Sequence, residues 1–331
     1  MAEPLGGGAS GAAAPSAGED VCLPFLVHGG AFRGRLVRLV SSATEILERH
    51  GDPEPVSILL AEAMAASVAL ATGLKFKGVF SLQIQGKGPV TTIVTDVTDN
   101  CDVRAWAKFD AEALAVEMTR ARPQGSVPRL MGAGAHLAFT VDQGPDKDRY
   151  QGIVELTGES LAEAVHHYFR QSEQLESALK VAVAPPQSPG APWVAGALLL
   201  QRMPEEGGVR IASKEDQEDA WRTAVILAGS LKDSELLDLT LTPERLLTRL
   251  FVTMGVAPSI RKPIHAKCRC SRVRSQGILA SFPMDELRSY AEDGAVHMTC
   301  EFCRTDYAFT LEELETIVAR HRGSAEKEPS P

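Results

Sequence analysis

Apolar and polar side chains alternate in short runs over the first two thirds of the chain. In residues 79–85 every second side chain is apolar, and this period of two predicts a half-buried strand. Further strands are expected at 91–97, 103–109, 136–141, 153–156 and 194–201. Turn-forming residues separate most of them at short intervals, which favours an antiparallel sheet over βαβ repeats.

Helices are expected where apolar side chains recur every three to four positions. The predicted helices cover 36–50, 56–74, 161–169, 214–231, 243–251 and a segment that follows Thr310. Ser160 with Glu163, and Thr310 with Glu313, have the spacing of capping boxes. The 56–74 stretch is long enough for a membrane span, but its alanines, its serines and its lack of an aromatic belt favour a helix inside a protein core.

Together these elements predict an α+β fold, an N-terminal antiparallel sheet with packed helices, followed by a helical linker and a small C-terminal zinc-binding domain. The expected division is a disordered tail at 1–20, an N-terminal α+β domain at 21–212, a linker at 213–262, a zinc-binding unit at 263–322 and a second tail at 323–331. The zinc-binding unit is too short to build much hydrophobic core, so we expect a structural metal ion to stabilise its fold.

Charge and motifs narrow the function further. The chain has 331 residues and a net charge of −9, which argues against a nucleic-acid binder over its whole length. The first twenty residues contain no Lys or Arg and no apolar run, so we expect no export signal and a cytoplasmic protein. No nucleophile elbow or phosphate loop is present, Gly132-Ala133-Gly134 is interpreted as a turn, and we expect no enzyme.

Four of the six cysteines form two close pairs near the C-terminus, Cys268-Arg-Cys270 and Cys300-Glu-Phe-Cys303. Two pairs separated by a short module are typical of a tetrahedral thiolate site, and we predict one zinc ion per chain. Iron remains an alternative metal, and His265 or His297 an alternative ligand. Cys22 and Cys101 have no spaced partner and are expected to be packed side chains, and His166-His167 is expected to lie on a solvated helix face.

A basic run surrounds the first cysteine pair: Arg261, Lys262, Lys267, Arg269, Arg272 and Arg274, with no acid between its ends. Such a field favours thiolates and their reaction with oxidants, but it also suits phosphate contacts. Two alternatives therefore stay open at this point. One is a zinc-ribbon module that binds nucleic acid, and the other is a thiol–disulfide oxidoreductase that uses Cys300-x-x-Cys303.

Several segments together resemble the thirty-three-kilodalton heat-shock chaperone family. The two cysteine pairs, with Ser271-Arg272 after the first and Tyr307-x-Phe309 after the second, resemble the redox-switch domain of that family. The N-terminal domain is resembled by Arg33-Gly34-x-Leu36-Val37, Leu74-Lys75-Phe76-x-Gly78, Gln83-x-Gln85-Gly86-x-Gly88-Pro89, Tyr150-Gln151-Gly152 and Tyr168-Phe169-x-x-Ser172-Glu173-Gln174-Leu175.

This resemblance implies a cytoplasmic, ATP-independent holdase for unfolded and oxidatively damaged proteins. Its reduced form would hold zinc through Cys268, Cys270, Cys300 and Cys303 and be inactive. Oxidation is expected to pair Cys268 with Cys270 and Cys300 with Cys303, to release zinc, to unfold the switch domain and linker, and to give a homodimer. Neither a membrane nor a nucleic acid is expected as a partner.

Overall fold

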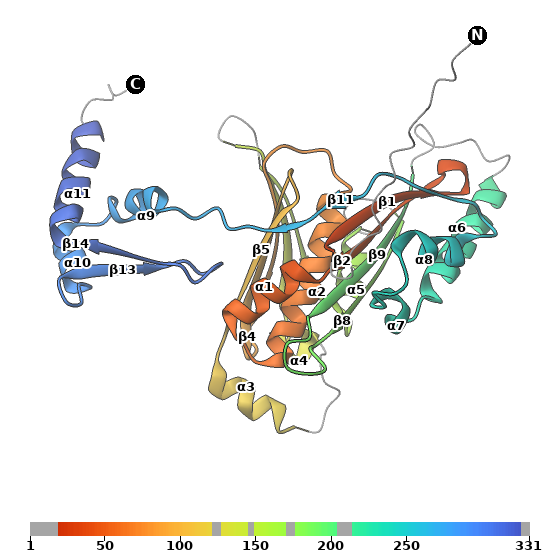
Figure 1. Ribbon diagram of the computed structural model, residues 1–331, viewed down its shortest axis with the longest axis horizontal. Helices are drawn as coiled ribbons and strands as arrows, with labels where there is room; N and C mark the ends of the chain where they lie inside the picture. The colour runs from red at the N-terminus through yellow and green to blue at the C-terminus, as the bar shows by residue number, and fades with distance from the viewer. Residues whose placement is uncertain (1–18, 121–126, 145–148, 170–175, 204–213, 326–331) are drawn as a thin grey trace, which may run out of the picture.

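Two large sheets and a small C-terminal hairpin organise the chain (Figure 1). The computed structural model describes residues 19–120, 127–144, 149–169, 176–203 and 214–325. The fold is α+β, as predicted, and the sheets are antiparallel apart from one short parallel pair. The motif residues 172–175, residues 1–18 of the predicted N-terminal tail and residues 326–331 lie outside the described part.

The first sheet joins distant parts of the sequence. In spatial order its strands are β10 (Val256–Pro258), β1 (Val21–Val27), β2 (Phe32–Leu39), β9 (Val194–Arg202) and β8 (Ser177–Ala184), and β11 (Lys262–Pro263) also pairs with β1. A short 3-10 turn at His28–Gly30 links β1 to β2. Strands from the predicted linker therefore complete the edge of the N-terminal sheet.

The second sheet is a more sequential meander. Its spatial order is β12 (His265–Ala266), β5 (Asp102–Phe109), β4 (Val90–Thr98), β3 (Val79–Gln85), β6 (His136–Asp142) and β7 (Tyr150–Glu155). Helices α3 (Ala111–Met118) and α4 (Val127–Met131) follow β5. Gly86 and Gly88 in the β3–β4 turn have no room for a Cβ, because the backbone of Met131 and its neighbours packs directly against them.

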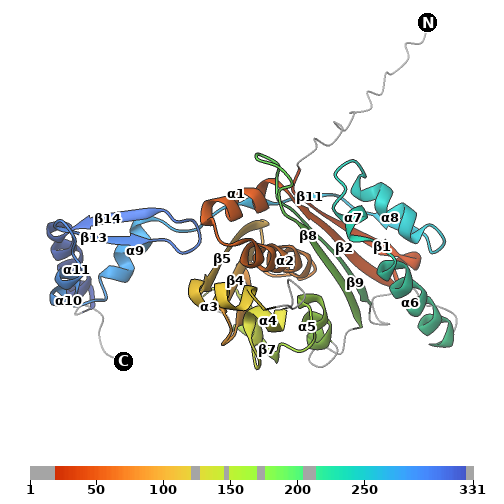
Figure 2. The same cartoon turned by 90° about the horizontal axis from the view of Figure 1, so that it is seen from below.

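Helix α2 (Glu54–Ala71) lies between the two sheets, with α1 (Ser41–His50) before it and α5 (Leu161–Tyr168) beside it (Figure 2). Fourteen of its eighteen residues are buried, and they form the centre of the main core. By length and composition it passes as a membrane span, yet 78% of its apolar window is buried inside the protein. The interpretation of this stretch as a core helix is confirmed.

Three helices cover the outer face of the first sheet: α6 (Lys214–Gly229), α7 (Asp233–Leu236) and α8 (Pro243–Phe251). Their apolar side chains, including Trp221, Leu247 and Phe251, pack on Phe25 and Phe32 to form a second core. The N-cap of α8 is Thr242, whose hydroxyl accepts a hydrogen bond from the amide of Arg245.

The C-terminal unit stands beside the body of the molecule and has a small core of its own (Figure 1). It contains α9 (Arg272–Leu279), α10 (Met284–Ser289), the hairpin β13 (Ala295–Thr299) with β14 (Asp306–Thr310), and α11 (Leu311–Ala325). The Thr310–Glu313 capping box is present with both of its hydrogen bonds. Helix α11 extends to Ala325, past residue 323, where the second tail was expected to begin.

The predicted strands are confirmed to within a few residues, but the expected helix at 36–50 is partly wrong. Residues up to Leu39 belong to β2, and the helix begins only at Ser41. Helices cover both faces of the first sheet, so consecutive apolar residues such as Leu36 and Val37 are all buried and show no period of two. For the same reason β1 was not predicted, and the small side chains of β8 gave no clear signal.

Candidate metal centre

The four clustered cysteines come from two loops of the C-terminal unit. Cys268 and Cys270 lie just before α9, which begins after its N-cap Ser271. Cys300 and Cys303 lie in the turn between β13 and β14, where the amide of Arg304 donates to the carbonyl of Cys300 over 2.8 Å. Arg304 has a φ of 54°, so the turn closes with a left-handed residue. Both loops are thus fixed by ordinary local hydrogen bonds.

The sulfur atoms of Cys268, Cys270, Cys300 and Cys303 all lie within 4.8 Å of one another. Cys268 Sγ is 3.7 Å from Cys300 Sγ, and Cys270 Sγ is 3.3 Å from Cys303 Sγ. Zinc–sulfur bonds of about 2.3 Å in a tetrahedron place the sulfurs about 3.8 Å apart. The four thiols therefore have the number, chemistry and spacing that a tetrahedral zinc site needs.

Hydrogen bonds and burial give the thiols unequal proton affinities. Burial raises the pKa of Cys270 to about 12, and neighbouring thiols add to the rise. Burial also acts to raise the pKa of Cys303, but its hydrogen bonds with Thr305 and with the adjacent thiols outweigh this effect and lower that pKa to about 6. The Tyr307 hydroxyl lies 3.1 Å from Cys270 Sγ. A bound cation would favour the thiolate form of all four.

A buried aspartate on the second sheet fixes the first cysteine loop. Asp96 of β4 is 5% exposed and pairs with Arg104 of β5 at 2.6 Å and with Arg269 at 2.7 Å. Arg269 is the residue between Cys268 and Cys270. Arg104 also places its Nη1 atom 3.9 Å from Cys268 Sγ. One carboxylate therefore connects the N-terminal body to the cysteine site.

The second cysteine loop contacts the same surface through Phe302. The guanidinium of Arg104 lies 3.7 Å from the centre of the Phe302 ring, and Trp106 meets that ring edge-on. His50 Nε2 lies 3.1 Å from the carbonyl oxygens of both Ala105 and Phe302. Sequence reasoning missed Asp96, Arg104, Trp106 and His50, because in the linear chain they are ordinary strand residues and the last residue of a helix, without the spacing of any motif.

The basic run around the first cysteine pair is largely neutralised by acids from elsewhere in the chain. Arg261 pairs with Glu244, Lys267 with Asp102, Arg269 with Asp96, and Arg272 with Glu313. Arg272 also stacks on Phe309. The linear sequence hides these partners, since they lie between 17 and 173 positions away.

The other candidate ligands lie apart from the cysteine cluster. Among the described residues, the cluster that could hold a metal contains neither His265 nor His297, and His297 bonds to Asp306 at 2.7 Å. Cys22 is buried, and its burial raises its pKa to about 11. Cys101 is buried at the turn before β5, and burial raises its pKa too. Both fit the expectation of packed side chains.

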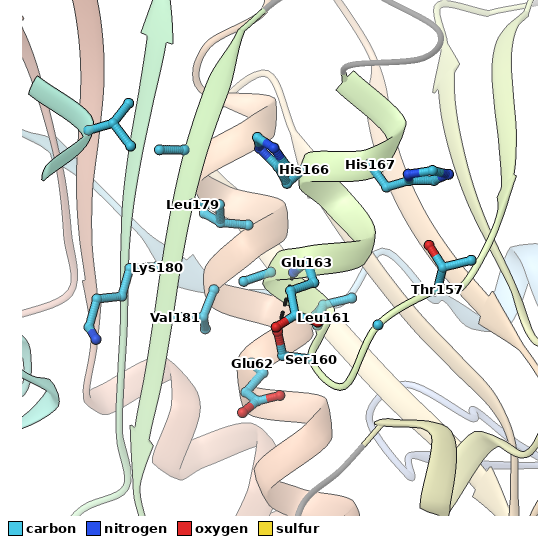
Figure 3. Close-up of a pocket in the computed structure, with 14 residues that line it drawn as sticks. Glu62, Thr157, Ser160, Leu161, Glu163, His166, His167, Leu179, Lys180 and Val181 are labelled. Carbon is cyan, nitrogen blue, oxygen red and sulfur yellow. Dashed lines mark hydrogen bonds between the residues drawn. The ribbon is translucent and has the colours of Figure 1, made fainter. Parts of the chain in front are cut away.

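A cavity of about 630 Å³ lies between α2, α5 and β8, and Figure 3 shows Glu62 and His166 on different sides of it. Burial raises the pKa of Glu62 to about 7, and the charge of Asp233 adds to this rise. His166 Nδ1 lies 2.6 Å from the carbonyl oxygen of Ser177. Among the described residues, His166 and His167 are not part of a group that could hold a metal ion.

Comparison with known proteins assigns the chain to a family. A family model described as Hsp33 protein matches residues 20–310. The chain belongs to the Hsp33 family. A 33 kDa chaperonin of Caulobacter vibrioides is 38% identical over 299 residues, which cover 89% of this chain and 96% of that protein. The Hsp33 relative from Pseudomonas putida strain GB-1, also a 33 kDa chaperonin, is 33% identical over 91% of this chain and 94% of its own length.

A solved structure supports the same fold. The crystal structure of the 33 kDa chaperonin from Thermotoga maritima superposes with a TM-score of 0.75 at 21% identity, over 92% of this chain and 99% of that one. The resemblance seen in the sequence motifs is therefore confirmed at the level of the family.

Proposed function

We propose that this Hsp33-family protein is a chaperone that binds unfolded proteins and is switched on by oxidation of its four clustered cysteines. The observation that carries the proposal is the double role of the cysteine loops. The four sulfurs of these loops meet within the C-terminal unit, and the same loops dock the unit on the second sheet through Arg269 and Phe302. A chemical change at the sulfurs would therefore affect both the fold of the unit and its attachment.

In the reduced state we propose one zinc ion per chain, with Cys268, Cys270, Cys300 and Cys303 as its ligands. Among the described residues, the core cluster of the C-terminal unit consists of six buried apolar side chains, which is little for an independent fold: Leu279, Leu287, Val296, Phe309, Leu314 and Val318. Zinc held by four thiolates would supply folding free energy on the order of 10 kcal/mol.

Oxidation would remove the ligands. The two thiolates of each pair would give up two electrons as their disulfide forms, and hydrogen peroxide would accept these electrons with two protons from solvent and become two water molecules. The family resemblance implies the pairs Cys268–Cys270 and Cys300–Cys303. Loops this short restrict the unfolded chain little, so the disulfides would not replace the stability that the metal gave. The unit would open, and its contacts with Asp96, Arg104 and Trp106 would be lost.

Client binding would then use apolar surface that is covered in the reduced protein. Helices α6, α7 and α8 cover an apolar face of the first sheet, and the strands β10 and β11 connect these helices to the C-terminal unit. Loosening of this connection would expose side chains such as Phe25, Phe32 and Leu247. We propose that binding needs no ATP, that the oxidised protein is a homodimer, and that the protein works in the cytoplasm.

The two rival functions have less support. A nucleic-acid interface would need free cations, whereas Arg261, Lys267, Arg269 and Arg272 each pair with a carboxylate. An oxidoreductase that uses Cys300 and Cys303 would leave the nearby thiols of Cys268 and Cys270 without a role.

The decisive experiment measures zinc content and aggregation suppression on the same sample before and after peroxide treatment. Reduced protein should contain one zinc bound by four sulfurs, as read by X-ray absorption, and should suppress aggregation of a heat-unfolded client poorly. Oxidised protein should have lost zinc and should suppress aggregation well without ATP. Equal suppression in both redox states would contradict the switch. Salt-sensitive RNA or DNA binding by the reduced protein would support the nucleic-acid alternative instead.

A further inference from the structure

An aromatic pocket of about 270 Å³ lies where α2 ends between the two sheets. Its walls carry six aromatic rings, which come from the segment after α2, from β3, β6 and β7, and from α5: Phe76, Phe80, Phe139, Tyr150, Tyr168 and Phe169. Four of the sequence motifs shared with the family contribute to it, those around Arg33, Leu74, Tyr150 and Tyr168. The proposed redox switch uses none of these residues.

The rings are held in a fixed arrangement. Tyr168 packs against Phe139 with ring centres 4.6 Å apart, and Phe139 packs on Phe80 at 6.0 Å. Gly152 makes this possible, because a Cβ at that position would lie 2.2 Å from the Tyr168 hydroxyl. The pocket is therefore built by close packing, and the glycine of the Tyr150-Gln151-Gly152 motif has a physical reason.

Two cations border the apolar walls. Arg33 of β2 donates from Nε to the Gln201 side chain at 3.1 Å, and Lys75 is exposed at the edge. Within the described ranges, no carboxylate lies within ion-pair distance of either side chain. Burial lowers the pKa of Arg33, which reflects the cost of holding its charge away from water. An anion at this position would offset that cost.

We propose that this pocket binds a carboxylate attached to one aromatic or branched apolar group. The rings would enclose the apolar group, and Arg33 and Lys75 would hold the carboxylate. The size fits, because a cavity of about 150 Å³ accepts benzene, so 270 Å³ accommodates a ring with a short acidic chain. Two sources share this chemistry: a free aromatic acid, and the C-terminal residue of a polypeptide chain. The inference is independent of the redox switch.

The test uses the full-length, reduced and zinc-loaded protein. N-acetylphenylalanine and its uncharged amide are titrated by calorimetry, and the acid should bind at least about tenfold more tightly, because only its carboxylate forms an ion pair with Arg33 and Lys75. Arg33→Gln should weaken binding of the acid about tenfold and leave that of the amide unchanged. Arg33→Lys, which keeps the charge, should recover part of the loss.

Lys75→Gln and Lys77→Gln form a matched pair two positions apart. Both lysines are exposed, but only Lys75 lines the pocket, so only Lys75→Gln should weaken binding. The comparison of these two lysine variants still tests the proposal if Arg33→Gln fails to fold. A short peptide ending in phenylalanine that binds more tightly than N-acetylphenylalanine identifies chain ends as the source, and equal or weaker binding identifies free acids. Equal affinity for acid and amide, no saturable binding, or equal loss in both lysine variants overturns the proposal.

Discussion

Asp96→Asn tests whether the docking of the cysteine loops restrains the proposed switch. The Asp96 carboxylate accepts hydrogen bonds from Arg104 at 2.6 and 2.9 Å, from Arg269 at 2.7 Å and from Ser81 at 2.5 Å. An asparagine keeps the shape of the side chain but removes its charge. Two guanidinium groups would then share a partly buried site without an acid between them.

The expected effect is large enough to measure. Removing one partner of a buried ion pair costs about 3–5 kcal/mol. The side chains of Arg104 and Arg269 are 17% and 27% exposed, so solvent screens part of the cost and the lower value of about 3 kcal/mol is appropriate. Since about 1.4 kcal/mol is a tenfold change, undocking of the C-terminal unit should become roughly a hundredfold more favourable.

The assay follows zinc release and aggregation suppression after a peroxide addition at fixed temperature. Asp96→Asn should keep its zinc while reduced, because all four cysteines remain. It should respond to peroxide faster than the unaltered protein, because an undocked unit exposes its thiols. Hydrogen exchange in the reduced protein should rise in β12 and in the loops that carry the cysteines.

Asp99→Asn is the matched control. It removes the same charge from an exposed side chain that lies three positions after Asp96, just beyond the end of β4. It should behave like the unaltered protein. If Asp96→Asn loses zinc at the same rate as this control and gains no hydrogen exchange near the cysteines, the docking contact does not restrain the switch.

Three further predictions concern residues outside the cysteine cluster. Cys22→Ser and Cys101→Ser should keep one zinc per chain and a normal peroxide response, measured by metal analysis and the same aggregation assay; loss of zinc in either would show that the ligand set is wrong. Glu62 has a folded-state pKa of about 7 against its usual 4.5, so its ionisation costs stability as the pH rises between these values. Glu62→Gln should therefore raise the free energy of unfolding in urea by about 3 kcal/mol at pH 8 and by little at pH 4, and an equal gain at both would contradict the burial argument. Gly152→Ala should lower thermal stability by about 1–3 kcal/mol through its clash with Tyr168, and an unchanged melting temperature would refute the packing argument.

The sequence predicted correctly those strands and helices that bury one face in the core and leave the other face at least partly exposed to solvent. β3 alternates because one face meets the core and the other is half-exposed. The Thr310–Glu313 capping box and the N-cap at Ser160 were also placed correctly, because capping is local, although the Glu163 carboxylate accepts from the amide of Glu159 rather than from that of Ser160. In contrast, β2 is covered on both faces, and its run of apolar residues up to Val40 looked like part of a helix. Periodicity reports what lies on each face, so it fails where tertiary packing makes the two faces alike.

At the candidate site, the sequence predicted the cysteines but not what they contact. Thiol spacing is a local signal, so the tetrad could be found without a fold. The partners of the basic run could not be found this way, because Asp96 and Asp102 approach it only after the second sheet has formed. The same limit applies to the aromatic pocket, whose motifs were visible separately while their convergence depends on both sheets.

Which sulfurs lie close together decides whether a new disulfide would stabilise the C-terminal unit or allow it to open. Two sulfur–sulfur contacts join the two loops, Cys268 with Cys300 at 3.7 Å and Cys270 with Cys303 at 3.3 Å, between residues 32 and 33 positions apart. A disulfide across either pair would restrict a long loop and favour the folded unit by about 4 kcal/mol in the chain-entropy model, against about 2 kcal/mol for a bond within one loop. Oxidation of the closed cluster would thus lock the unit rather than open it. Release in the proposed switch would instead require pairing within each loop, and these pairs are also within reach because all four sulfurs lie within 4.8 Å of one another. Opening of the unit would then break the contacts of Arg269 and Phe302 with the second sheet.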